Sequence, residues 1–275
     1  MINHTGEGNM KKIALCLLLL VGSLFANTLS EIKSKGVLRV GVFADEPPFG
    51  ELRDGAFVGF EIDFAKAIAK HIFQGKNGKV EFVSVEVPQR EKFLIENTVD
   101  LIMAGYIITD ERAKVVDFSF PYFSVNIGVL TRKDSNIQKQ EELRGKTIIV
   151  EDSAVAKSYF ASRGYKTVKC PNSNACYKML KDGAGDAYAN DNLIVLVYPI
   201  IDRTVEVNIK NLGKSNFLGV GVAKGNKELL DVVNNALVSL NKEGFFRDSF
   251  QNTIDPFYKG TIEEKYFLLD IYNIF

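Results

Sequence analysis

Two residues of opposite charge, Arg112 and Asp191, have side chains that could bind one small ligand together. A guanidinium presents a planar fork that matches a carboxylate in bidentate geometry. Asp191 follows the alternating run 186–190, which predicts a β-strand, and a carboxylate at the C-terminal edge of a strand can accept hydrogen bonds from an ammonium group. Each residue also has a simpler interpretation. Arg112 could be a surface residue in the charged run 110–114, and Asp191 could be the N-cap of a helix over 192–200.

The elements that would position these residues follow from the hydrophobic pattern. Short β-rich runs alternate with helical patterns, which is typical of an α/β fold with mostly parallel strands. Strands are expected at 37–42, 79–85, 99–104, 126–131, 146–150, 167–170, 186–190 and 217–223. Helices are expected at 60–73, 88–97, 153–163, 175–181, 192–200 and 227–243.

The order of these elements suggests two lobes. Lobe 1 is expected to comprise residues 27–130 plus 217–275, and lobe 2 residues 131–216. The chain would then cross twice between the lobes, and such a two-strand hinge lets a few residues absorb a closing rotation. The strand pattern alone would equally fit a single doubly wound domain.

The start of the chain has the pattern of a cleaved signal peptide. Residues 10–26 contain two lysines, an apolar run and a small residue at a cleavage point after Ala26. A retained membrane anchor is a weaker alternative because the run is short. A lipoprotein is weaker because Leu15, which is not a small residue, precedes Cys16. We therefore expect residues 1–26 to be removed, with Met10 as an alternative start.

Composition argues against several classes of function. The 34 Lys and Arg residues balance 34 Asp and Glu residues, so no excess of charge indicates a nucleic-acid partner. The only histidines are His4 and His71, and no phosphate-binding loop of the Gly-x-x-x-x-Gly-Lys type occurs. We therefore expect no metal, no cofactor and no catalytic residue.

Cys170 and Cys176 are the cysteines that remain after the expected cleavage. In an oxidising compartment they could close a small loop between a strand and the next helix. Two free thiols are the alternative. The disulfide is favoured, because both cysteines lie beside turn residues that would let them approach each other.

Three blocks of sequence resemble one family, the polar amino-acid-binding proteins of bacterial ABC uptake systems. The first is Gly41-Val-Phe-Ala-Asp-Glu-Pro-Pro-Phe49, and the second is the amphipathic helix that begins Gly59-Phe-Glu-Ile-Asp-Phe64. The third runs from Val99 through Thr109-Asp-Glu-Arg112 to Pro121-Tyr122. The resemblance covers about residues 31–250. The first block and the run at 133–137 are especially similar to the cysteine-binding members from epsilon-proteobacteria, with acidic-amino-acid-binding members close behind.

The resemblance implies a fold, a function and partners. The fold would be an α/β, two-lobed periplasmic binding protein of type II, with the ligand cleft between the lobes. The protein would be periplasmic and monomeric, and it would capture a free L-amino acid, with cysteine or another small polar one as first choice. It would deliver this ligand to the membrane permease of an ABC importer and would not be an enzyme.

The resemblance also assigns roles to residues of the cleft. Arg112 would bind the α-carboxylate of the ligand and Asp191 its α-ammonium group, while Arg90 would line the cleft. Phe43, Phe49 and Tyr106 are candidates for an aromatic wall, with Tyr106 the first choice. The remaining candidates for ligand contact are Glu46, Gly105, Ile107, Glu151, Ser153, Ala154, Val155 and Asn190.

The chain departs from the family at several of these positions. Glu151-Asp-Ser-Ala-Val155 stands where most relatives have a polar residue and a Gly-Thr-Thr-like turn, and Ile107 replaces a frequent threonine. Ala154 thereby removes a hydroxyl group, Glu151 and Asp152 add negative charge near an anion site, and Glu46 adds another acid near the mouth of the pocket. These changes favour a ligand with a neutral or cationic side chain over one with an acidic side chain.

Two other functions remain open. Cyclohexadienyl dehydratases resemble these binders and use a cleft acid to expel water and carbon dioxide from a carboxylated ring, a role that Glu151 could take. A sensor that presents its ligand-bound state to a receptor is the second alternative. The C-terminal segment 262–275 has no counterpart in the family and could be an extra packed helix or a disordered tail.

Overall fold

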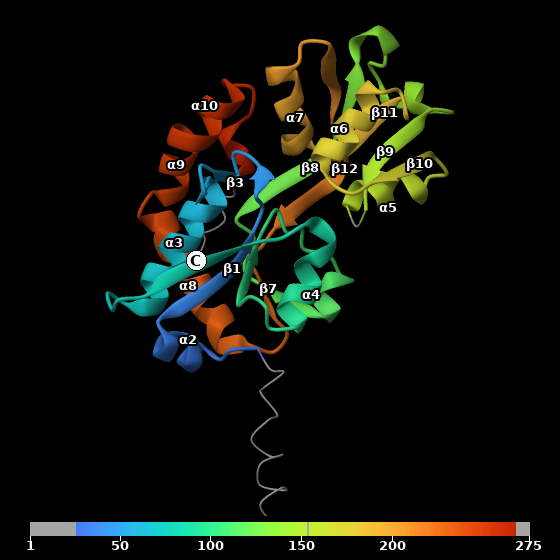
Figure 1. Cartoon of the computed structure of the whole chain (residues 1–275). Helices are drawn as coiled ribbons and strands as arrows, with labels where there is room; N and C mark the ends of the chain where they lie inside the picture. Colours follow the sequence, from blue (N-terminus) through green and yellow to red (C-terminus); the bar gives the residue numbers. More distant parts are fainter. Residues whose placement is uncertain (1–25, 153, 268–275) are drawn as a thin grey trace, which may run out of the picture.

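Two five-stranded β-sheets, one in each of two lobes, organise the chain (Figure 1). The computed structural model describes residues 26–152 and 154–267. The expected signal peptide therefore lies outside the described residues, except for Ala26, as do Ser153 and the last eight residues of the chain. In the part that is described, no helix is long and apolar enough to span a membrane.

The first sheet has the strand order β5-β1-β6-β13-β7. Strands β1, β5 and β6 run parallel, whereas β13 is antiparallel to both of its neighbours. These strands are β1 (Val37–Val42), β5 (Lys79–Ser84), β6 (Leu101–Met103), β7 (Val116–Phe118) and β13 (Gly221–Ala223). A small antiparallel sheet beside them contains β2 (Asp45–Glu46), β3 (Gly50–Arg53) and β4 (Ala56–Val58).

Helix α3 (Phe60–Phe73) packs on this first sheet and has the predicted bounds. Its apolar residues at 60, 64, 68 and 72 are all buried, as the helical spacing predicts. Gly59, just before the helix, has φ 126°, and a Cβ atom there would lie 2.5 Å from the carbonyl oxygen of Phe49. This turn therefore requires glycine.

The other helices of lobe 1 come from two stretches of the chain, 29–95 and 227–258. They are α2 (Leu29–Lys35), α4 (Arg90–Ile95), α8 (Lys227–Lys242), α9 (Phe245–Ser249) and α10 (Asp255–Tyr258). The helix expected at 88–97 is a 3₁₀ turn, η1 (Val87–Gln89), followed by the shorter α4. Lobe 1 also contains the 3₁₀ turns η2 (Arg112–Lys114) and η6 (Glu264–Tyr266) and a π-helical turn, η5 (Phe250–Ile254), whereas the 3₁₀ turns η3 (Lys133–Ser135) and η4 (Gln140–Leu143) follow β8.

The segment that follows α10 is packed as far as the structure describes it. The ring of Phe267 lies 5.1 Å from the ring of Phe60 and 4.5 Å from that of Phe123, both in edge-on geometry. Phe267 also forms an isolated bridge with Phe123, and only 2% of its surface is exposed. This part of the C-terminal segment therefore belongs to the core of lobe 1.

The second sheet has the strand order β10-β9-β11-β8-β12. Strand β9 is parallel to β10 and β11, whereas β8 is antiparallel to β11 and β12. Its strands are β8 (Phe123–Arg132), β9 (Thr147–Glu151), β10 (Lys166–Cys170), β11 (Ala187–Asp191) and β12 (Val205–Leu218). Its helices are α5 (Val155–Ala161), α6 (Ser173–Lys181) and α7 (Asn192–Ile201). Helix α6 begins before the predicted residue 175 because the Asn172 side chain caps it.

Strands β8 and β12 lie side by side and carry the chain between the two lobes (Figure 1). Strand β8 pairs with β11 at residues 127–131, so the expected lobe boundary between residues 130 and 131 falls inside a strand of the second sheet. The strand predicted at 217–223 is also divided. Strand β12 ends at Leu218 and β13 begins at Gly221, because the chain passes from one sheet to the other between them.

Cys170 and Cys176 form a disulfide, with their Cα atoms 5.2 Å apart. The bond links the end of β10 to α6, and both cysteines are buried. We expect the double substitution Cys170→Ser/Cys176→Ser to lower the free energy of unfolding by about 2 kcal/mol, since a short loop limits the entropic effect. Urea denaturation measures this, with dithiothreitol-treated wild type as the control that should match the variant. An unchanged unfolding midpoint would contradict the prediction.

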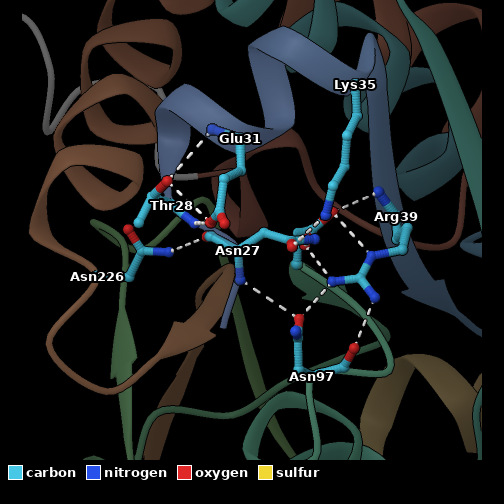
Figure 2. A network of polar contacts seen from close by, with 8 residues as sticks. Asn27, Thr28, Glu31, Lys35, Arg39, Asn97 and Asn226 are labelled. Atoms are coloured by element: carbon cyan, nitrogen blue, oxygen red, sulfur yellow. Dashed lines mark hydrogen bonds and ion pairs between the residues drawn. The ribbon is translucent and has the colours of Figure 1, made fainter. Parts of the chain in front are cut away.

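Asn27 is bonded into lobe 1 through each of its polar groups (Figure 2). Its backbone N–H donates to Asn97 Oδ1 (3.4 Å), and its side-chain amide donates to Asp100 Oδ1 (2.9 Å). Its side-chain oxygen accepts from Lys35 Nζ (2.8 Å), and its carbonyl accepts from Asn226 Nδ2 (2.8 Å). Residue 27 is therefore a firmly held part of the folded lobe.

Candidate functional site

A narrow cleft between the lobes brings together most of the residues predicted to bind a ligand. Phe43, Gly105 and Asp191 line two adjoining hollows of this cleft. Glu46 and Phe49 line the first hollow only. The other predicted residues in the second hollow are Arg90, Ile107, Arg112, Glu151, Ala154, Val155 and Asn190.

Arg112 lies at the start of η2 and is mostly buried, with 11% of its side chain exposed. Its Nε forms an ion pair with Glu91 Oε1 (3.1 Å), and one terminal nitrogen donates to the carbonyl of Ile107 (2.8 Å). The guanidinium also stacks over the ring of Tyr106, with its central carbon 5.2 Å from the ring centre. These contacts fix the plane of the guanidinium, which is what bidentate recognition of a carboxylate requires.

Arg90 is more deeply buried than Arg112, with 4% of its surface exposed. Its Nε donates to the carbonyl of Val87 (3.2 Å), and one terminal nitrogen donates to the carbonyls of Ala104 (2.9 Å) and Gly105 (3.0 Å). Burial, followed by the charge of Arg112, lowers the pKa of Arg90 to about 10. Two of the guanidinium nitrogens of Arg90 therefore donate to backbone carbonyls, including those of the turn that forms one wall of the cleft.

Tyr106 does not line either hollow, contrary to the prediction that it is the first choice for an aromatic wall. It is completely buried, and its ring lies 5.0 Å from the guanidinium carbon of Arg90 and 4.7 Å from the ring of Phe118. The backbone turns at Gly105, where φ is 53°, and the ring of the next residue lies against the guanidinium groups of both arginines. The ring of Tyr106 thus packs against the guanidinium groups of Arg90 and Arg112 and helps to hold them in place.

Asp191 stands at the N-cap position of α7, but its side chain makes no capping hydrogen bond. Asp191 therefore occupies the predicted N-cap position, but the prediction that its side chain caps the helix is wrong. Asp191 instead lines both hollows. Burial raises the pKa of its carboxyl group to about 6, against the opposing charges of Arg90 and Arg112. A carboxylate in this position can accept hydrogen bonds from a ligand cation.

Glu151 is the last residue of β9 and is 97% buried, with 3% of its surface exposed. Its Oε2 accepts from Asn190 Nδ2 (3.1 Å) and from Ser173 Oγ (3.4 Å). Burial raises the pKa of Glu151 to about 7, and Arg90 and the Asn190 amide oppose this rise while Asp191 adds to it. Glu151 is thus a carboxyl group that changes its charge near neutral pH.

Glu46 faces the same cleft from lobe 1 and is half-buried. Its loss of solvent raises its pKa well above the ordinary value. The Ser173 hydroxyl opposes this rise, while Glu151, Asp45 and Asp191 reinforce it. Three carboxyl groups, from Glu46, Glu151 and Asp191, therefore act on one another across the cleft.

The raised pKa values of Glu151 and Asp191 make the stability of the ligand-free protein dependent on pH. Both lie above the ordinary values of about 4 for unfolded chains, so the folded state binds protons more tightly. Their stabilising contribution is complete below about pH 4 and is lost as the pH rises through 6 to 7. We expect the melting temperature of Glu151→Gln to fall less than that of wild type between pH 5 and 8. Equal slopes in the two proteins would contradict this assignment.

Several apolar residues of the cleft were not predicted as site residues. They are Val87, Val125, Leu193, Ile194 and Leu218. In the sequence they carry only the hydrophobic pattern of a core, and nothing local distinguishes a cleft wall from a lobe interior. Among residues 26–152 and 154–267, no group of three or more His, Cys, Asp or Glu side chains could hold a metal ion.

The fold and the cleft define a class: this is a two-lobed α/β binding protein whose polar residues converge between the lobes. The family of bacterial extracellular solute-binding proteins, family 3, matches residues 38–252. The chain belongs to this family.

The chain is similar to several characterised members. A solute receptor for L-cysteine of Neisseria gonorrhoeae has 35% identity and a TM-score of 0.82, over 87% of this chain and 98% of that one. A cysteine-binding protein from Campylobacter jejuni has 36% identity and a TM-score of 0.81, over 86% and 96%. A glutamine-binding protein of Geobacillus stearothermophilus is 32% identical over 206 residues, which are 73% of this chain and 78% of the relative.

Proposed function

We propose that this protein captures a free L-α-amino acid and delivers it to the permease of an ABC importer. One observation carries this proposal: Arg112 and Asp191 line the same hollow, and the Asp191 side chain is not used as a helix cap. A fixed guanidinium suits the α-carboxylate, and the partly buried carboxylate of Asp191 suits the α-ammonium group. The other predicted contacts line the walls around these two groups, except Tyr106, which lies outside both hollows, and Ser153, which lies outside the described residues. No cofactor takes part.

The side chain of the ligand would lie among groups that accept hydrogen bonds. Glu46, Glu151 and Asn190 surround the hollows, and a ligand carboxylate would add a further acid to carboxyl groups that already raise one another's pKa. An acidic amino acid is therefore disfavoured, and a small side chain that donates a hydrogen bond fits best. Cysteine is the first choice, supported by the two relatives that are named for it.

The protein would act as a monomer, and ligand binding would close its two lobes onto each other. Strands β8 and β12 would act as the hinge, and their first and last residues, Phe123 and Leu218, pair directly with each other. The division between the lobes would then fall near these two residues. Contacts that a zwitterion makes with both lobes exist only in the closed form, so the ligand favours closure.

We propose export to the periplasm with cleavage after Ala26. The support is the position of Asn27, which is 9% exposed and hydrogen-bonded through all its polar groups directly after the apolar run. A retained anchor would leave no linker between that run and the lobe. We expect mass spectrometry of the purified periplasmic protein to find Asn27 as its first residue. A chain that retains residues 10–26 would contradict this.

A thermal-shift panel of the standard amino acids tests the ligand class. Cysteine should raise the melting temperature at millimolar concentration, because a ligand that binds only the folded state stabilises it by mass action. Aspartate and glutamate should have smaller effects than cysteine, serine and glutamine. Calorimetry on the best ligand then gives its affinity. A panel with no thermal shift and no heat signal would refute the proposal.

An enzyme related to cyclohexadienyl dehydratase is a second candidate, and one observation favours it. Glu151 lies in the cleft with a pKa of about 7, which suits an acid that protonates a leaving hydroxyl. Incubation with prephenate and arogenate, followed by chromatography for phenylpyruvate and phenylalanine, tests this function. Product formation that Glu151→Gln abolishes would support the enzyme, and no product would exclude these substrates.

A further inference from the structure

Glu61 is a buried acid that the sequence indicates only as a favourable charge in the first turn of α3. In the structure none of its surface is exposed. Its Oε1 accepts hydrogen bonds from the backbone N–H of Gly105 (2.9 Å) and from the hydroxyl of Tyr122. Its Oε2 is buried and has no hydrogen-bond partner in the part of the chain that the structure describes. A buried acid with one oxygen fully used and the other unused is costly, so its presence in the fold needs an explanation.

The backbone of Gly105 is hydrogen-bonded through both its N–H and its carbonyl group. Glu61 accepts from its N–H, while Arg90 donates to its carbonyl oxygen (3.0 Å). Gly105 has φ 53°, and a Cβ atom there would lie 3.0 Å from the ring of Phe43, so the turn fits closely against a residue of the cleft. Gly105 lines both hollows. Any shift of this turn therefore changes the shape of the ligand site.

Glu61 also reaches the hinge. Tyr122 directly precedes β8, and its backbone N–H donates to the carbonyl of Leu218, the last residue of β12 (2.9 Å). The segment after Gly105 is bonded to the same strand end, since the N–H of Ile108 donates to the carbonyl of Phe217 (2.8 Å). One carboxyl oxygen thus joins the ligand-binding turn to the point where both crossing strands enter lobe 1.

Burial shifts the pKa values of both Glu61 and Tyr122. Burial raises the pKa of Glu61, and the hydrogen bonds from Tyr122 and Gly105, followed by the charge of Arg90, oppose this rise. Burial and the neighbouring Glu61 also raise the pKa of Tyr122 well above its ordinary value, so its hydroxyl remains a donor.

We propose that Glu61 is a positioning residue for ligand binding: its Oε1 fixes the Gly105 turn against the base of the hinge. The length of this side chain, and not its charge, then determines how well the cleft fits the ligand. The effect on affinity rests on the proposed function, whereas the effect on Gly105 itself does not.

Two matched variants separate reach from charge. Glu61→Gln keeps the acceptor oxygen at the same distance from the backbone and removes the charge. Glu61→Asp keeps the charge and withdraws the carboxylate by one methylene, or about 1.5 Å. We expect the Gln variant to bind the best amino acid of the panel within about threefold of wild type. The Asp variant should bind about tenfold or more weakly, since the Gly105 N–H loses a buried partner.

Hydrogen exchange of the Gly105 amide in the ligand-free protein is the second measurement. Exchange should be about tenfold or more faster in Glu61→Asp than in wild type, and close to wild type in Glu61→Gln. A merely structural role would lower the melting temperature of both variants without this difference at Gly105. If Glu61→Asp does not fold, Tyr122→Phe replaces it, because loss of the hydroxyl that orients Oε1 should also speed Gly105 exchange.

The outcomes distinguish this proposal from the function itself. If Glu61→Gln loses as much affinity as Glu61→Asp, the charge of Glu61 matters as much as its length. If Gly105 exchange is unchanged in Glu61→Asp, the shorter side chain has not lost the contact with the Gly105 N–H. Either result overturns the proposal. If wild type binds no amino acid while Gly105 exchange behaves as expected, the proposed ligand class is wrong and the role of Glu61 stands.

Discussion

Arg112→Ala is expected to abolish amino-acid binding while the protein remains folded. The substitution removes the guanidinium that would face the ligand's α-carboxylate and leaves that carboxylate buried without a cation. Loss of one partner from such a desolvated pair costs on the order of 2–5 kcal/mol, or roughly 30-fold to several thousand-fold in affinity. Calorimetric titration with the ligand found in the panel measures this loss. Far-ultraviolet circular dichroism checks the fold.

Two controls sharpen this experiment. Arg112→Lys should recover only part of the affinity, because an ammonium group cannot reproduce the planar fork that Glu91, Ile107 and Tyr106 orient. Lys114→Ala removes an exposed cation from the same short helix and should leave the affinity unchanged. If Arg112→Ala binds within twofold of wild type, Arg112 does not contact the ligand and the assignment of the site is wrong.

Asp191→Asn is expected to weaken binding by about 10- to 100-fold, because a charge-assisted hydrogen bond to the ligand's ammonium group is lost. Helix α7 should be unaffected, since the Asp191 side chain does not cap it. The melting temperature of the ligand-free variant should therefore be at or above that of wild type at pH 8, where the variant lacks a buried charge. Calorimetry and thermal denaturation together measure both effects. Unchanged affinity would contradict the predicted contact.

The same residue predicts how affinity depends on pH. The pKa of Asp191 is about 6 in the ligand-free protein, and a bound ammonium group would lower it. Binding should therefore release protons near pH 6, and affinity should fall as the pH decreases from 7 to 5. In Asp191→Asn this part of the dependence should disappear, and what remains should reflect Glu151, with its pKa of about 7. Titrations at several pH values, in buffers of different ionisation enthalpy, test this directly.

The elements with strong local signals were predictable from the sequence. Helix α3 has the predicted bounds because apolar residues recur every turn, and the central strands of both sheets lie within a residue or two of their predicted positions. The three motif blocks identified the family, and they contain six of the residues that line the cleft. These features depend on neighbouring residues in the chain, and the hydrophobic period reports them directly.

The direction of side chains at the cleft could not be predicted in this way. Tyr106 follows Gly105 in a motif associated with ligand binding, yet its ring is buried against the guanidinium groups of Arg90 and Arg112. Arg90 has the chemistry of a ligand contact, but it donates to three backbone carbonyls. The partners of both residues come from segments distant in sequence or from a turn whose geometry no pattern specifies.

The sequence by itself therefore determined the family, the alternation of strands and helices, and the chemical types available to a cleft. Only the tertiary structure decided that Asp191 is free of its capping role, that the chain changes sheets between Leu218 and Gly221, and that Glu61 contacts Gly105. The physical reason is the range of the interactions. Helix and strand patterns arise from residues a few positions apart, whereas the cleft forms where burial brings together side chains and backbone groups tens of residues apart.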